Sequence, residues 1–300
     1  MKKKLVAGAV TLLSVVTLAA CANSTNKDVV TMKGDTITVS DFYDEIKTNQ
    51  GAQQVLFQMT INKVFEKEYG SKVSDKEVDK ELAKQKKQLG NQFDAYLAQQ
   101  GLTEETAKKQ IRSNMLLEYA VSQAAKKDIK ESDYKTAFES YTPEVTAQII
   151  KLDSEDKAKE VLEAAKAEGA DFAQIAKENS TDTATKDKGG EVKFDSGTAD
   201  IPSQVKEAAF KLDENGISDV ITVSAGQNYS PSYYIVKLDK KTEKGSDWKK
   251  YEKRLKEIII EGRKQDTNYI RSIIAKAMTN ANIKVKDDAF KSTFNQYLQN

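Results

Sequence analysis

The sequence predicts an α+β fold in which helices from both ends of the chain form one domain, with a smaller α+β domain inserted between them. Apolar residues recur at helical spacing from Phe42 to Ala137, whereas strand and helix patterns alternate between Pro143 and Lys240. A further helix pattern follows, and its apolar stripe comprises Trp248, Tyr251, Leu255 and Ile258. Because this helix has too much apolar surface to stand alone, we expect it to pack on the N-terminal helices.

The first residues have the pattern of a lipoprotein signal. Three lysines at positions 2–4 precede an apolar stretch, Leu5 to Leu18, that is too short to span a bilayer. The stretch ends in Leu-Ala-Ala-Cys, which resembles the lipobox of bacterial lipoproteins, and Cys21 is the only cysteine of the chain. An ordinary secretory cleavage site would leave that single cysteine unexplained. We therefore predict a signal peptide at residues 1–20, lipid attachment at Cys21 and a polar tether over 21–27.

The composition excludes several kinds of chemistry. The 300 residues include no histidine, so the chain has no Ser-His or Cys-His pair and no His-ligated metal site. Basic residues number 47 and acidic residues 46, and removal of the three N-terminal lysines leaves 44 against 46. A nucleic-acid-binding protein would show a basic excess, so this class is excluded. No phosphate-binding loop, dinucleotide motif or calcium loop is present, and we predict no cofactor and no metal.

The N-terminal part is predicted to begin with a hairpin and to continue as helices. Val29–Met32 and Thr36–Val39 have the pattern of two short strands around a Gly-Asp turn, and Ser40 is expected to cap the first helix. Ser74 to Glu77 has the form of a capping box. The helix that starts there is expected to run until Gly101 breaks it.

The central segment is predicted to combine strands with helices. In chain order we expect strand Val145–Leu152, helices Glu155–Glu168 and Phe172–Glu178, a polar Gly-rich loop, helix Ser203–Leu212, and strands near Val220–Val223 and Tyr233–Leu238. After the Trp248 helix, Ala281–Val285 has a strand-like pattern. The patterns between Val145 and Leu238 define the inserted α+β domain.

Six blocks of the central segment stand in the order and spacing of a known family. They are Thr146–Ile150, Gly169–Ala173, Ala176–Asp182, Lys188–Val192, Val205–Leu212 and Tyr234–Leu238. Together they resemble the parvulin-type peptidyl-prolyl isomerases. The order of the whole chain, with lipobox, helical N-terminal region, parvulin-like unit and returning C-terminal helix, resembles the PrsA-type foldase lipoproteins of Gram-positive bacteria.

The resemblance implies where an isomerase site would lie. Parvulins place one histidine on the first strand and another on the last, around a Cys or Asp; here the corresponding residues are Gln148, Tyr234 and Asp182. The pocket for the proline ring would be lined by Val192, Ile201 and Val205, the last of which is usually phenylalanine. Isomerisation breaks no covalent bond, so a desolvated pocket could act without imidazole. The alternatives are that Asp182 is a turn carboxylate and that Gln148 and Tyr234 only make structural hydrogen bonds.

Two classes of function are compatible with the sequence. The first is a foldase or chaperone, held by lipid at the outer face of a Gram-positive-type cell membrane, that assists unfolded or partly folded secreted proteins. Its helical domain would comprise 28–142 plus 243–300, and its parvulin-like domain, 143–242, would be weak or inactive or, alternatively, an active isomerase. The second class is a solute-binding lipoprotein, which needs two doubly wound α/β lobes. The helical segment Phe42 to Ala137 argues against that class, and a homodimer is left open.

Overall fold

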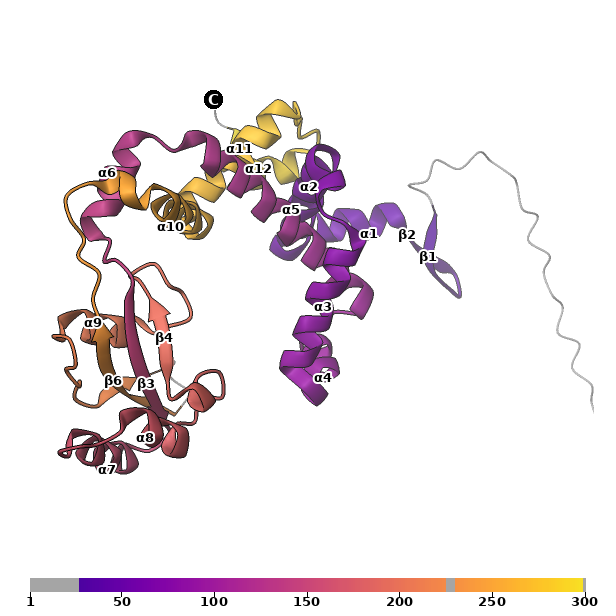
Figure 1. The fold of residues 1–300 in the computed structure, drawn as a ribbon. Helices are drawn as coiled ribbons and strands as arrows, with labels where there is room; N and C mark the ends of the chain where they lie inside the picture. The colour runs from indigo at the N-terminus through magenta and orange to yellow at the C-terminus, as the bar shows by residue number, and fades with distance from the viewer. Residues whose placement is uncertain (1–26, 225–229, 299–300) are drawn as a thin grey trace, which may run out of the picture. The chain divides into compact units, whose positions relative to one another are not determined.

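The computed structural model describes residues 27–224 and 230–298, and these form two compact units (Figure 1). The terminal unit contains the described residues up to Leu117 and those from Arg271 on, so it combines both ends of the chain. The central unit runs from Glu118 to Ile270. The α+β class with an inserted sheet domain is therefore confirmed. The predicted signal peptide, Cys21 and most of the tether lie outside the described residues.

The terminal unit is a hairpin followed by helices. Strands β1 (Asp28–Met32) and β2 (Asp35–Thr38) pair antiparallel, and Gly34 in the turn has a φ of +87° that favours glycine. The helices are α1 (Val39–Ile46), α2 (Gln50–Tyr69), α3 (Asp75–Leu89), α4 (Phe93–Gln99), the first part of α5 (Glu104–Asp128), most of α11 (Thr267–Asn280) and α12 (Lys291–Leu298). None of the helices that the structure describes is long and apolar enough to cross a bilayer.

Two helix boundaries differ from the sequence-based expectation. Thr38, not Ser40, caps α1: its hydroxyl accepts from the Asp41 N–H, and the Asp41 carboxylate accepts from the Thr38 N–H at 2.8 Å. The helix that starts at the Ser74 capping box ends at Leu89 instead of reaching Gly101. Gly90 has a φ of +51°, which the helix cannot continue through, and the chain restarts as α4.

The two chain ends pack on one another inside the terminal unit. The rings of Phe57 on α2 and Phe294 on α12 pack in a T-shaped arrangement, with 5.5 Å between centroids. Tyr43 donates its hydroxyl proton to Asp287 at 2.7 Å, and the Gln53 amide donates to the Ala289 carbonyl at 3.1 Å. These contacts join segments more than 230 residues apart in the sequence.

The predicted docking of the Trp248 helix is confirmed within the central unit. Trp248 stacks on Tyr134 of α6 (Glu131–Ser140) with 5.0 Å between centroids. Leu255 of α10 (Glu252–Gln265) is fully buried, and the Arg263 guanidinium donates to the Ala125 carbonyl of α5 at 2.9 Å. A helix from the C-terminal part thus packs on helices from the N-terminal part.

The central sheet is antiparallel and has the strand order β4-β3-β6-β5. Its strands are β3 (Val145–Leu152), β4 (Glu191–Phe194), β5 (Ile221–Val223) and β6 (Ser232–Lys240), and its helices are α7 (Glu155–Lys166), α8 (Phe172–Asn179) and α9 (Ser203–Lys211). Helix α9 covers one face, and α7 and α8 cover the other (Figure 1). This antiparallel sheet is not one of the doubly wound α/β lobes that a solute-binding lipoprotein requires.

Two strand expectations were wrong. Strand β4 lies in the segment that we predicted to be a polar loop, because its four residues pair with β3 over Val145–Gln148. Ala281–Val285 is not a strand in the structure, since it finds no neighbouring strand to pair with among the described residues. Both errors concern pairing between distant segments, which local periodicity does not report.

Candidate functional site

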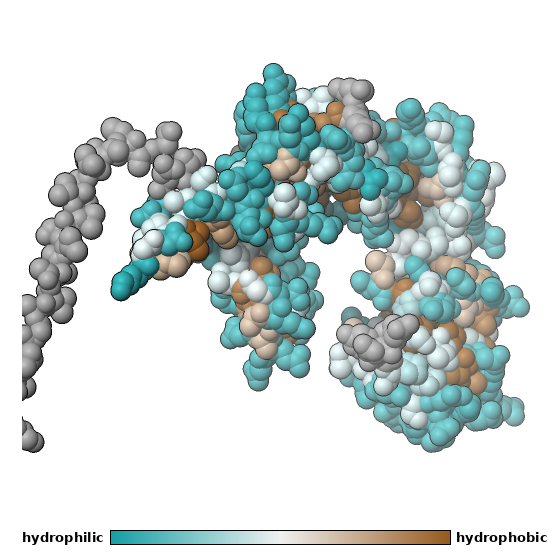
Figure 2. All heavy atoms as spheres, turned by 180° about the vertical axis from the view of Figure 1, so that it is seen from behind, coloured by the Kyte–Doolittle hydropathy of each residue, from teal (hydrophilic) through white to brown (hydrophobic). Residues whose placement is uncertain are grey.

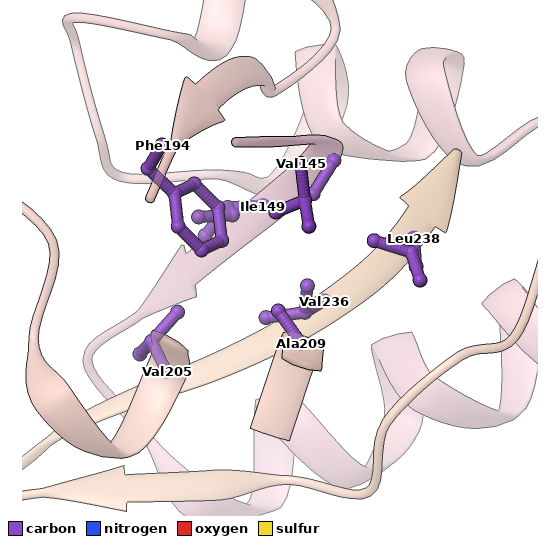
Figure 3. Close-up of a cluster of buried hydrophobic side chains, with 8 residues drawn as sticks. Val145, Ile149, Phe194, Val205, Ala209, Val236 and Leu238 are labelled. Atoms are coloured by element: carbon purple, nitrogen blue, oxygen red, sulfur yellow. The ribbon is translucent and has the colours of Figure 1, made fainter. Parts of the chain in front are cut away.

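The central sheet presents two different faces because strand side chains alternate. Ala147 and Ile149 of β3 lie on the face that α9 covers, together with Val236 of β6. Ile150 and Ile235 lie on the opposite face, against α7 and α8. Figure 3 shows the buried side chains of the first face, with Ala209 of α9 beside Val236.

The three residues predicted to receive a proline ring lie together on the α9 face. Val205 is fully buried in this cluster, and Val192 and Ile201 pack against it while partly exposed. Tyr234 packs against the same cluster. The structure therefore brings four of the predicted site residues together. Val205 contributes to the floor of the face and supplies no exposed aromatic wall.

Gln148 does not belong to this group, because it lies on the opposite face of the sheet. It stands opposite Lys237 in the β3–β6 pairing, whereas Tyr234 stands opposite Lys151, three positions away. An odd separation places the two side chains on different faces. The Gln148 amide donates to the Asp239 carboxylate at 3.3 Å, and its buried Oε1 has no hydrogen-bond partner among the described residues. The β3 residues on the same face as Tyr234 include Ile149 and, directly opposite it, Lys151.

Asp182 is held inside a tight turn. Its carboxylate accepts from the Thr185 hydroxyl at 2.6 Å and from the Ala184 N–H at 3.1 Å. Its carbonyl accepts from the Lys186 N–H at 2.9 Å. These bonds are the pattern of an Asx turn, so most of the acceptor capacity of Asp182 is used locally.

The one phenol at the site stays protonated. Burial raises the pKa of Tyr234, and the nearby carboxylates of Asp182 and Asp153 raise this pKa further. Tyr234 can thus donate a hydrogen bond but cannot act as a base near neutral pH. No cluster of metal-ligating side chains occurs in the described parts of the chain. An apolar face with a neutral phenol can hold a prolyl group, and isomerisation itself requires no proton transfer.

An ion pair that the sequence patterns did not indicate lies beside this face. Asp195 follows β4, and both of its carboxylate oxygens accept from the Arg254 guanidinium of α10, at 2.6 and 2.8 Å. The Tyr141 hydroxyl donates to the same carboxylate at 3.1 Å. The ion pair fixes α10 to the end of β4. Its partners are 59 residues apart, so no local motif could have revealed it.

The sheet, its covering helices and the apolar α9 face define a parvulin-type domain, and comparisons with known proteins agree. The PPIC-type PPIASE rotamase domain family matches residues 140–240, a range that contains the whole four-stranded sheet. The foldase protein PrsA of Streptococcus sanguinis is 63% identical over 299 residues, which cover 100% of this chain and 89% of the relative.

Solved structures extend the likeness to the whole fold. The crystal structure of PrsA from Streptococcus pneumoniae is 54% identical, with a TM-score of 0.79 over 90% of this chain and 99% of that chain. PrsA from Lactococcus lactis is 39% identical, with a TM-score of 0.67 over 91% and 100% of the two chains. The chain belongs to the PrsA foldase family and is a foldase with a parvulin-type rotamase domain.

Proposed function

We propose that this foldase works mainly as a chaperone for secreted proteins outside the cytoplasm, held at the membrane by a lipid on Cys21. In this proposal residues 28–142 plus 243–300 form the client-binding domain. Residues 143–242 form the parvulin-like domain, whose isomerase activity is weak. Clients are unfolded or partly folded secreted chains, which expose apolar side chains until they fold.

The distribution of exposed apolar side chains supports this division. All large apolar side chains that are strongly exposed in the described residues lie between Val29 and Tyr96, in the terminal unit. They are Val29, Val30, Met32, Ile37, Phe42, Tyr43, Val55, Met59 and Tyr96. Figure 2 shows hydrophobic surface beside the β1–β2 hairpin of this unit. Exposed apolar surface of this kind marks an interaction site, and binding there needs no catalytic group.

The parvulin-type face supports only a modest contribution to catalysis. On β3, Ile149 lies on the same face as Tyr234 and Lys151 stands directly opposite it, and the Asp182 carboxylate is engaged within its own turn. The barrier to isomerisation is about 18–20 kcal/mol, and lowering it requires groups that favour the twisted amide. An active isomerase is the alternative, since the apolar face and the Tyr234 hydroxyl are both present.

We expect Asp182→Ala to change client binding by less than about twofold, because Asp182 bonds only within its own turn. Wild type and variant would be compared in a protease-coupled prolyl-isomerisation assay and, on the same sample, in suppression of aggregation of an unfolded secreted protein. Asp187→Ala, at an exposed carboxylate of the next turn, is the matched control. Strong turnover in the wild type that disappears in Asp182→Ala, with aggregation suppression falling in parallel, would favour the active isomerase.

We expect Cys21→Ala to release the protein from the membrane into the medium with its fold unchanged. Lipid on this cysteine would be the main attachment, and the thiol is the only group in the chain that can carry a thioether-linked lipid. Cell fractionation measures the release, and mass spectrometry of the mature N-terminus identifies the modification. An unmodified Cys21, or a mature terminus at another residue, would contradict the proposal.

A further inference from the structure

An open apolar groove runs along α2 in the terminal unit. One concavity of about 580 Å³ lies between α1, α2 and the segment Ile283–Asp287, and its walls include Val55 and Met59. A second, of about 510 Å³, continues on the other side of Thr60 and Ile283, which line both. Together they have the volume of a site that takes several side chains at once.

The apolar wall of the groove has no cover. The side chains of Val55 and Met59 on α2 are 59% and 51% exposed, although α2 buries Phe57 and Ile61 on its other side. Burial of these apolar side chains against a partner would be favourable, because it removes apolar surface from water. The groove is therefore suited to a partner that brings apolar side chains.

The opposite wall is a segment without regular secondary structure that has free backbone groups. All four residues from Ile283 to Lys286 line the groove, and their burial alternates: Ile283 and Val285 are half-buried, whereas Lys284 and Lys286 are exposed. The Ile283 N–H donates to the Met278 carbonyl, but those of the next three residues have no acceptor in the part of the chain that the structure describes. Unpaired backbone N–H groups such as these can pair with an extended chain.

The rim of the groove carries an excess of positive charge. Lys63, Lys67, Lys284 and Lys286 line it, and none of these ammonium groups has an ion-pair partner among the described residues. The rim carboxylates are Glu68 and Asp287, and Asp287 already accepts from the Tyr43 hydroxyl and the Ala289 N–H. The free charge is therefore mainly cationic.

The geometry points to an extended, acidic segment of an unfolded client as the occupant of this groove. Its backbone pairs with Ile283–Lys286, its alternate apolar side chains contact Val55 and Met59, and its carboxylates meet the rim lysines. The inference rests on the proposed chaperone function, for which it names the class of client segment. A helical partner would leave the backbone groups of Ile283–Lys286 unpaired.

The test measures binding of two short peptides to the mature, full-length chain by fluorescence anisotropy. Both peptides have apolar residues at alternate positions. They contain no proline, so binding to the parvulin-type face is not expected. One peptide is flanked by glutamates and the other by lysines. We expect the glutamate peptide to bind at least about fivefold more tightly at low salt, and this preference to shrink as salt is added. N-methylation of the backbone of the glutamate peptide should lower its affinity to that of unstructured control peptides.

Two sets of variants assign the binding to the groove. Val55→Gln with Met59→Gln should weaken both peptides, whereas Tyr96→Gln, at an exposed aromatic on α4, should not. Lys284→Glu with Lys286→Glu should reverse the peptide preference, whereas Lys80→Glu with Lys87→Glu on α3 should leave it unchanged. Exposed sites are used so that the variants keep the fold, which circular dichroism checks.

Three results would overturn the inference. Unchanged peptide binding in the groove variants, with aggregation suppression intact, would show that the chaperone function is real but uses another surface. Conversion of a dimer to a monomer by Val55→Gln with Met59→Gln in sedimentation would assign the groove to a second copy of the chain. Equal affinity for both peptides in every variant would remove the charge preference. Failure of the wild-type protein to suppress aggregation would instead contradict the proposed function.

Discussion

Replacing Arg254 by methionine is expected to lower the free energy of unfolding of the central unit by about 3–5 kcal/mol, because the change leaves the Asp195 carboxylate buried without its cation. The Asp195 side chain is 7% exposed, and the guanidinium of Arg254 reaches both of its oxygens. Methionine keeps the apolar stem, so the lost charge dominates the effect. Urea unfolding of the central unit, monitored by amide hydrogen exchange in β3 and β6, measures the change in the free energy of unfolding.

The effect of Arg254→Met should depend on pH. Burial by itself would raise the pKa of Asp195, but the Arg254 guanidinium and the hydroxyls of Thr198 and Tyr141 lower this pKa below its usual range. The stability that the pair contributes is therefore full above the unfolded-state pKa of about 3.9 and is lost as pH falls through the lower folded-state pKa. The difference between wild type and variant should be largest at neutral pH and shrink below about pH 4.

A surface ion pair provides the control. Lys159→Met removes the partner of Glu155 on α7, where both side chains are well exposed, and it should cost less than about 1 kcal/mol. Asp195→Asn combined with Arg254→Met should recover part of the lost stability, because no buried charge is then left. A loss below about 1 kcal/mol for Arg254→Met alone would show that water reaches Asp195 and that the pair does not fix α10.

Local signals in the sequence were enough to predict most helices and the hairpin. The Ser74–Glu77 capping box and the turn at Gly34 involve neighbouring residues, and the structure has both where they were predicted. The apolar stripe of the Trp248 helix also predicted correctly that Leu255 would be buried. The capping box and the turn are interactions between residues close in sequence, and the apolar stripe is a pattern along a single helix.

The arrangement of the α9 face, which would hold a prolyl group, depends on strand register. Local signals in the sequence could not predict it. Gln148 and Ile149 are adjacent in the sequence, and only the pairing with β6 decides which of them shares a face with Tyr234. The same holds for β4, whose four residues become a strand because β3 lies beside them. The prediction placed Val192, Ile201 and Val205 on one surface, where the structure also has them, but it did not identify Ile149.

Replacing Phe294 by alanine is expected to lower the free energy of unfolding of the terminal unit by about 3–5 kcal/mol, as for other buried aromatic residues. Phe294 is 3% exposed and packs edge-on against Phe57, so its removal opens a cavity between α12 and α2. Helix α12 has only eight residues and cannot stay helical without this packing. Loss of its anchor should therefore release the whole helix.

Amide hydrogen exchange on the full-length chain separates this outcome from a general loss of stability. In Phe294→Ala the amides of α2 should exchange faster, whereas those of β3 and β6 should keep their protection, because they belong to the central unit. Phe42→Ala is the control: this side chain is 53% exposed, so its loss should cost less than about 1 kcal/mol. Unchanged exchange in α2 would mean that the N-terminal helices are stable without the C-terminal segment, and that packing of the two chain ends does not hold this unit together.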